Sequence, residues 1–189
     1  MIVIVDNYDS FTYNLFQYVK EYYNDVKVIK NDDINLLDLD FQKIKALILS
    51  PGPGKPSEAG LMPKIIKKYY LHIPILGICL GHQSIIETFG GSIVNDDEIC
   101  HGKVHKMKHF SNCIIFDNIS NNFEATRYHS LISDHSIPDC LEVTAVTKKN
   151  SKIMGIQHKQ HQIFGLQFHP ESIETKNGMK MIKNFINAI

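Results

Sequence analysis

The sequence contains neither a long apolar run nor an excess of charge of one sign. Lys and Arg together number 20, Asp and Glu together number 20, and the formal net charge is therefore zero. Proteins that track a phosphate backbone usually carry a basic excess, so this balance argues against nucleic acid as a partner. No stretch approaches the ~18 consecutive apolar residues of a membrane-spanning helix, which argues against a membrane protein.

Cysteine is also scarce, and its spacing is not that of a Cys-x-x-Cys motif. The four cysteines are Cys79, Cys100, Cys113 and Cys140. Residues 1–10 hold a short apolar run with no Lys or Arg before it, so we expect a first β-strand there rather than a signal peptide. We therefore expect reduced thiols and a cytoplasmic protein. The 189 residues suffice for a single domain, 1–189, whose core needs no disulfide.

Strand-like and helix-like segments alternate in the first half of the chain. The continuous β-branched run at 2–5 predicts a strand buried on both faces of a parallel sheet, and further strands are predicted at 26–29, 46–49 and 74–78. Helical spacing predicts a helix capped by Ser10 and further helices at 61–70 and up to Phe89. This alternation is typical of a three-layer, doubly wound α/β fold, with a mostly parallel sheet and helices on both faces.

Residues 92–168 have a different pattern of short apolar runs. We expect these runs to form an additional small antiparallel segment, at 113–116, 141–146, 153–158 and 163–168. Helical spacing returns at 178–189, where the predicted buried stripe comprises Met179, Ile182, Phe185 and Ile186.

The sharpest local pattern is Gly77-Ile-Cys79-Leu-Gly81, between a predicted strand and a predicted helix. It has the form of a nucleophile elbow with cysteine at its centre. Such a turn strains the backbone of the central residue, and the flanking glycines relieve the crowding. Cys79 would lie at a helix N-terminus, where unpaired N–H groups favour a thiolate. A buried structural cysteine is the alternative.

A cysteine nucleophile needs a base, and the base needs a group that orients it. His169-Pro-Glu171 follows an apolar strand, and Pro170 keeps His169 out of the helical conformation. Residues two apart in an extended chain point to the same side, so the imidazole and the carboxylate can lie together. A surface turn is the alternative for this motif.

A third pattern is the loop 50–60, which is rich in proline and glycine. Glycines expose backbone N–H groups, and a loop after a parallel strand faces the crevice where α/β proteins bind ligands. The loop can offer an N–H to an oxyanion beside the N–H of Leu80. A rigid surface turn and a phosphate cradle are the alternatives, although the GxxxxGK[ST] pattern is absent.

Taken together, these patterns resemble the class I glutamine amidotransferases, and most closely the glutaminase component, component II, of anthranilate synthase and aminodeoxychorismate synthase. The resemblance runs along the whole chain. Its motifs lie at 6–14, 50–54, 57–60, 77–83, 101–103, 127–131 and 165–172. The Cys-Leu-Gly-His-Gln motif marks the class, whereas Asn-Tyr-Asp-Ser-Phe-Thr and Arg-Tyr-His-Ser-Leu narrow it to the chorismate-using enzymes.

The resemblance implies hydrolysis of L-glutamine to glutamate and ammonia through a cysteine thioester. It implies a catalytic triad of the nucleophile Cys79, the base His169 and the orienting Glu171. It also implies a glutamine-binding and oxyanion-binding set formed by Gly52, Pro53, Gly54, Leu80, Gln83, Ser130 and Leu131. It implies no metal and no cofactor in this chain.

The resemblance further implies a separate chorismate-using synthase subunit, which would use Mg²⁺ and receive the ammonia. We expect the interface to surround the mouth of the site and to use the Pro-Gly loop and His101-Gly-Lys103. Loop 50–54 is more similar to the anthranilate enzymes, whereas 125–131 and 153–156 are more similar to the para-aminobenzoate branch. The acceptor is therefore anthranilate synthase, aminodeoxychorismate synthase or both.

His101, His105 and His109 recur every four residues, a metal-ligand spacing on a helix. The alternation around them instead favours a strand with solvent-exposed histidines.

Two other functions fit the residues taken alone. One is a free-standing cysteine hydrolase of the same fold, and the other is a non-catalytic, flavodoxin-like binding module.

Overall fold

A mixed nine-stranded sheet forms the centre of the computed structural model, which describes residues 1–110 and 113–189. One half is parallel, and its strands in spatial order are β2 (Val26–Lys30), β1 (Ile2–Asp6), β3 (Ala46–Leu49), β4 (Ile75–Ile78) and β11 (Ile163–Leu166). The sheet continues with antiparallel strands β10 (Ile153–His158), β9 (Leu141–Thr147), β6 (Lys103–His109) and β7 (Asn122–Arg127). A separate antiparallel pair joins β5 (Ile93–Asn95) to β8 (Leu131–Ser133).

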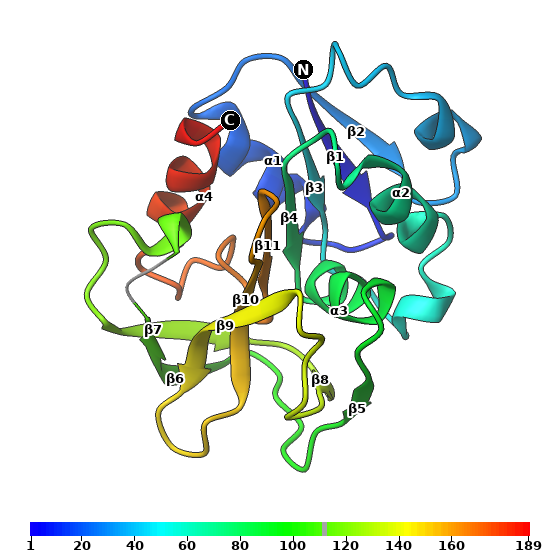
Figure 1. Cartoon of the computed structure of the whole chain (residues 1–189). Helices are drawn as coiled ribbons and strands as arrows, with labels where there is room; N and C mark the ends of the chain where they lie inside the picture. The colour runs from blue at the N-terminus through cyan, green and yellow to red at the C-terminus, as the bar shows by residue number, and fades with distance from the viewer. Residues whose placement is uncertain (111–112) are drawn as a thin grey trace.

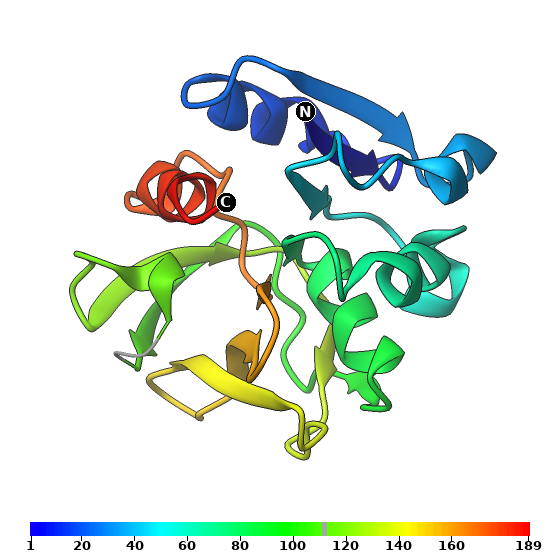
Figure 2. The ribbon, with the colours of Figure 1, turned by 45° about the horizontal axis from the view of Figure 1, so that its top comes forward.

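Helices cover both faces of the parallel half, as Figure 1 shows. Side chains of β1 alternate between the two faces: Ile2 and Ile4 pack in the core beneath α1 (Thr12–Lys20) and α4 (Gly178–Asn187). Val3 and Val5 pack on the other side, beneath α2 (Met62–Tyr69) and α3 (Leu80–Thr88). Figure 2 shows α4 beside α1 although they come from opposite ends of the chain. The predicted three-layer, doubly wound α/β class is therefore confirmed.

Three local predictions were wrong. Ser10 does not cap α1; the Asp9 carboxylate accepts the Phe11 N–H at 2.8 Å and the Asp6 carboxylate accepts the Thr12 hydroxyl at 2.8 Å. Residues 114–116 form a short 3₁₀ helix, η3 (Ile114–Phe116), rather than a strand. The Met179 side chain faces away from the core, because the buried stripe of α4 runs through Gly178, Met181, Ile182, Phe185 and Ile186.

The parallel strands bring several loops to one edge of the sheet. The loops after β1, β3, β4 and β11 all begin at the carboxyl ends of neighbouring strands. The 3₁₀ helix η2 (Pro56–Glu58) lies in the loop after β3, and η1 (Ile34–Asp38) follows β2. Ligands of open α/β sheets bind at this edge. Within the described residues, no helix has both the length and the apolar character needed to cross a bilayer.

Candidate active site

Cys79 occupies a strained turn between β4 and α3. Its backbone angles, φ of 49° and ψ of −100°, lie in a region that residues other than glycine rarely adopt. The turn is tight: a Cβ on Gly77 would lie 2.5 Å from the Gly81 backbone, and a Cβ on Gly81 would lie 2.5 Å from the Leu49 carbonyl oxygen. The two flanking glycines therefore permit the close approach that the elbow requires. Cys79 as a whole is 7% exposed, and it directly precedes the first residue of α3.

Pairing of β4 with β11 places His169 near this turn. The Cys79 N–H donates to the Leu166 carbonyl at 2.8 Å, directly beyond the end of the two strands. His169 Nδ1 and Glu171 Oε1 are 2.6 Å apart, and both side chains are buried. Since Nδ1 faces the carboxylate, the tautomer or imidazolium with a proton on Nδ1 is the one that Glu171 stabilises.

The electrostatics of this cluster favour the protonated form of His169. Burial disfavours the imidazolium, but the charges of Glu171 and Cys79 and hydrogen bonds to both raise the pKa of His169 well above its usual range. The buried Nε2 has no oxygen or nitrogen partner among the described residues, which leaves it for the Cys79 sulfur and for substrate. A proton held on His169 keeps the sulfur available as a nucleophile.

Several contacts fix the loop that carries His169 and Glu171. The Thr175 hydroxyl donates to the His169 carbonyl at 2.8 Å. At Gly178 an added Cβ would come 1.8 Å from the Pro170 carbonyl oxygen, so α4 begins directly against the loop. The Tyr128 ring lies 5.0 Å from the His169 ring, edge to face. Imidazole and carboxylate are therefore held before any substrate arrives, as preorganised catalysis requires.

The Pro-Gly loop lies against the Cys79 turn. A Cβ on Gly52 would lie 2.5 Å from the Asn7 Cβ and 2.8 Å from the Leu80 Cδ2, so only glycine fits. Asn7 anchors the loop: its backbone N–H donates to the Ser50 hydroxyl at 2.9 Å, and its side-chain amide donates to the Ser50 carbonyl at 2.8 Å. The loop therefore stands beside Leu80, as the oxyanion prediction requires.

Cys79 lies where two cavities meet. The smaller, of about 140 Å³, is lined by Gly52, Pro53, Gly54, Cys79, Gln83, Tyr128, His129, Ser130 and Leu131. The larger, of about 420 Å³, adds the loop after β1, together with His101 and His169. Eight of the ten residues predicted for the site line one of these cavities. The other two contact residues that do: Glu171 pairs with His169, and Leu80 packs next to Gly52. Their catalytic and binding roles stay predictions.

Gln167 is a site residue that the sequence reasoning missed. Its side chain is fully buried and donates from Nε2 to the Cys79 sulfur at 3.6 Å. Its Oε1 accepts from the Gln83 amide at 3.1 Å, and the same amide donates to the Leu131 carbonyl at 3.0 Å. Gln83 and Leu131 are therefore linked to the sulfur through Gln167. Its place two residues before His169, beyond a buried strand, was the available signal.

Two further elements of the wall were also missed. Asp9 and Phe11 follow β1 and line the larger cavity, where burial raises the pKa of the Asp9 carboxyl. His129 accepts from the Arg127 Nε at 3.0 Å through Nε2, and its Nδ1 contacts the Leu131 carbonyl at 2.9 Å. Burial, followed by the Arg127 charge, lowers the pKa of His129 to about 3, so this ring is neutral. It therefore supports the Leu131 backbone as a hydrogen-bond donor.

Two of the evenly spaced histidines, His105 and His109, lie on β6 as predicted, whereas His101 precedes the strand. They are not all exposed. His109 is buried, stacks on Phe116 with ring centroids 4.7 Å apart, and contacts the Ile119 carbonyl through Nε2 at 3.0 Å. The prediction of exposed histidines was wrong there because β6 pairs on both sides within the sheet. His101 lines the larger cavity.

All four cysteines are free thiols.

The sequence matches the family described as Glutamine amidotransferase class-I over residues 3–189. The chain belongs to this family. Membership of the family agrees with the elbow cysteine and with the His–Glu pair beside it.

Curated relatives are similar to this chain along nearly its whole length. The chain is 48% identical to Anthranilate synthase component 2 of Lactococcus lactis, covering 100% of this chain and 95% of the relative. It is 46% identical to Aminodeoxychorismate/anthranilate synthase component 2 of Bacillus subtilis, covering 100% and 96%. It is 44% identical to Bifunctional protein TrpGD of Thermotoga maritima over 98% of this chain, but spans only 32% of that protein.

A solved structure is similar in fold. The crystal structure of a protein described as a GMP synthase subunit from Thermoplasma acidophilum aligns with a TM-score of 0.87 and 29% identity. The alignment covers 98% of this chain and 92% of that one. Since 98% of this chain is aligned, the similarity covers the antiparallel as well as the parallel part of the sheet.

Proposed function

We propose that the chain is a glutaminase component that hydrolyses L-glutamine and passes the ammonia to a separate synthase. The observation that carries the proposal is the elbow cysteine, Cys79, opposite the 2.6 Å pair of His169 and Glu171. This cysteine–imidazole–carboxylate arrangement performs acyl transfer. Membership of the amidotransferase family supplies glutamine as the acyl donor.

The reaction proceeds in two halves. His169 holds the proton of Cys79, and the thiolate attacks the side-chain carbonyl carbon of glutamine. The N–H groups of Gly52 and Leu80 stabilise the oxyanion, and the imidazolium returns its proton to the nitrogen that leaves as ammonia. His169 then takes a proton from water, whose oxygen attacks the thioester. Glutamate leaves and Cys79 regains its proton.

The smaller cavity is the proposed site for the amino-acid end of glutamine. It is walled by Pro53 and Gly54 on one side and by Gln83, Ser130 and Leu131 on the other. The Leu131 carbonyl already accepts from Gln83 and contacts His129. Residues 130–131 therefore bind glutamine through their other backbone groups. No cofactor or metal takes part in this chemistry.

The proposed partner is a chorismate-using synthase subunit that holds the Mg²⁺ of the complex. Large exposed apolar side chains occur in the segments that carry the site: Tyr8, which lines the larger cavity, is 57% exposed, Ile99, two residues before His101, 72%, and Ile173, two residues after Glu171, 87%. Exposed apolar side chains of this kind support a protein interface there. The Pro-Gly loop and His101-Gly-Lys103 are part of the proposed interface. The names of the relatives support anthranilate synthase, aminodeoxychorismate synthase or both as the acceptor.

The test is release of glutamate from glutamine by the chain alone and with each chorismate-using synthase of the same cell. We expect stimulation by at least one synthase, and loss of all release in Cys79→Ala. Stimulation by both synthases would identify a shared subunit. Full activity without any synthase would contradict the partner proposal, and release by Cys79→Ala would contradict the mechanism.

A further inference from the structure

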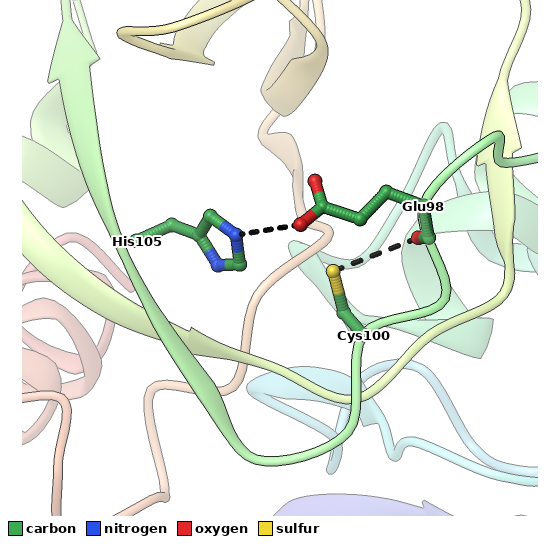
Figure 3. Close-up of side chains that lie close together, drawn as sticks. All are labelled: Glu98, Cys100 and His105. Carbon is green, nitrogen blue, oxygen red and sulfur yellow. Dashed lines mark hydrogen bonds and ion pairs between the residues drawn. The ribbon is translucent and has the colours of Figure 1, made fainter.

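Three potential metal ligands lie together outside the triad. Glu98 and Cys100 are in the loop between β5 and β6, and His105 is on β6; Figure 3 shows them converging from these two segments. One ligand atom from each lies within 4.8 Å of the others. Cys100 is 2% exposed, whereas the side chains of Glu98 and His105 are 39% and 22% exposed, so solvent reaches the cluster from one side.

The His105 ring is oriented as metal-binding imidazoles usually are. Its Nδ1 lies 3.3 Å from the Lys103 carbonyl oxygen, where it acts as a donor. Metal-bound imidazoles commonly donate their second N–H to such a backbone carbonyl, which directs the lone pair of the other nitrogen to the ion. That other nitrogen, Nε2, lies 3.5 Å from Glu98 Oε1. When Nε2 carries no proton, these two atoms are both acceptors, and either a proton or a metal cation between them stabilises their approach.

The spacing also fits a tetrahedral ion. Zinc bonds of 2.0–2.3 Å hold neighbouring ligand atoms about 3.3–3.6 Å apart. The 3.5 Å separation of His105 and Glu98 already matches this range. The Cys100 sulfur makes only a weak 3.6 Å bond to the Glu98 carbonyl oxygen, so a small rotation brings it to the ion. We propose that Glu98, Cys100 and His105 bind a divalent cation of the zinc class at the rim of the Cys79 cavity.

Neighbouring positive charges shape this site. Arg127 lies 3.8 Å from Glu98 Oε2 and remains paired with Asp96 at 2.7 Å, so Oε1 is the oxygen that faces the ion. Lys103 lies 4.0 Å from Oε1, but its side chain is 55% exposed and can move into solvent. On binding, the Cys100 thiol loses its proton to solvent and the sulfur bonds to the cation. The site therefore exchanges one proton for each ion.

The ion connects two parts of the wall of the active site. Cys100 donates from its backbone N–H to the His129 carbonyl at 3.1 Å, and the next residue, His101, lines the cavity beside Tyr128. The ligands flank His101-Gly-Lys103, so a bound ion closes this segment into a chelate ring. The glutaminase chemistry does not use the ion. Its effect is to order the segment at the mouth of the cavity.

The test uses the full chain carrying Cys79→Ala, so that the catalytic thiol does not compete for metal. Titration with Co²⁺ alone should give one bound ion per chain and a sulfur-to-cobalt charge-transfer band. Adding Cys100→Ser should abolish the band, and adding His105→Ala should weaken binding by at least about 100-fold, beyond the 10–100-fold typical of lost outer-shell partners. Adding Lys103→Gln should tighten binding by about two- to fivefold, as expected for removal of an exposed charge.

Two matched variants control for the number of thiols and imidazoles. Cys140→Ser and His135→Ala, each in the same Cys79→Ala chain, should leave stoichiometry and spectrum unchanged. Zn²⁺ should also slow amide exchange of residues 98–104. The proposal is overturned if the charge-transfer band is missing, if it survives Cys100→Ser, or if Cys140→Ser removes it. Because no glutamine is turned over, failure here leaves the proposed glutaminase function standing.

Discussion

Replacing Glu171 by glutamine removes the carboxylate that faces His169 and preserves the size of the side chain. The carboxylate lies 2.6 Å from Nδ1, and both groups are buried. A hydrogen bond to a charged group contributes about 1.5–3 kcal/mol, and about 1.4 kcal/mol is a factor of ten. If that stabilisation is needed in the transition state, Glu171→Gln lowers kcat/KM for glutamine by about 10- to 150-fold.

The pH profile gives an independent readout of the same change. Glu171 helps to raise the pKa of His169, so its removal lowers that pKa. Activity needs the imidazolium beside the thiolate, and the high-pH limb of kcat/KM should therefore move to lower pH. The assay is initial-rate glutamate release with and without the synthase. Glu174→Gln is the matched control because Glu174 is exposed on the same loop. Unchanged rates and an unchanged limb in Glu171→Gln would refute the orienting role.

Three other predictions concern the surroundings of Cys79. Gln167→Met removes the 3.6 Å donor to the sulfur, and loss of about 1 kcal/mol should slow alkylation of Cys79 near neutral pH by about fivefold. Gly52→Ala adds a methyl group 2.5 Å from the Asn7 Cβ, so the loop must shift, and kcat should fall by about 10²–10³ as an oxyanion donor is displaced. His129 has a pKa of about 3 when folded and about 6.5 when unfolded, so the unfolded state binds a proton that the folded state does not as pH falls below 6.5. In urea unfolding, the change in stability between pH 7 and 5 should therefore be less unfavourable by about 2 kcal/mol in His129→Gln than in the unmodified chain.

Most of the parallel half of the fold was predictable because its strands are apolar runs; β2 is the exception, since Lys27 interrupts it. A short continuous apolar run is typical of a strand that is buried on both faces of a parallel sheet. The structure buries Ile2–Val5 and Ala46–Leu49 completely. The antiparallel half was harder, since a short alternating run does not identify its partner. Pairing of β6 with both β9 and β7 buries His109, which the alternation alone had left exposed.

The candidate site was predictable where backbone rules fixed it. The Gly-x-Cys-x-Gly turn and the His-Pro-Glu motif follow neighbouring parallel strands, so their side chains had to meet at one edge of the sheet. Gln167 follows the same strand, so the same rule could have found its position, but its contact with the Cys79 sulfur needed the structure. The Glu98–Cys100–His105 cluster could not be found in this way, because no spacing motif links the loop before β6 to the strand itself.

Labelling of Cys79 by a glutamine analogue that carries an electrophilic chloroketone in place of the amide tests the central claim most directly. Intact-mass and peptide analysis should find a single adduct on Cys79, prevented by excess L-glutamine but not by L-asparagine. His169→Ala should slow the labelling, because the imidazole no longer holds the thiol proton. Adducts on Cys100, Cys113 or Cys140 in place of Cys79, or labelling that glutamine does not prevent, would contradict the account.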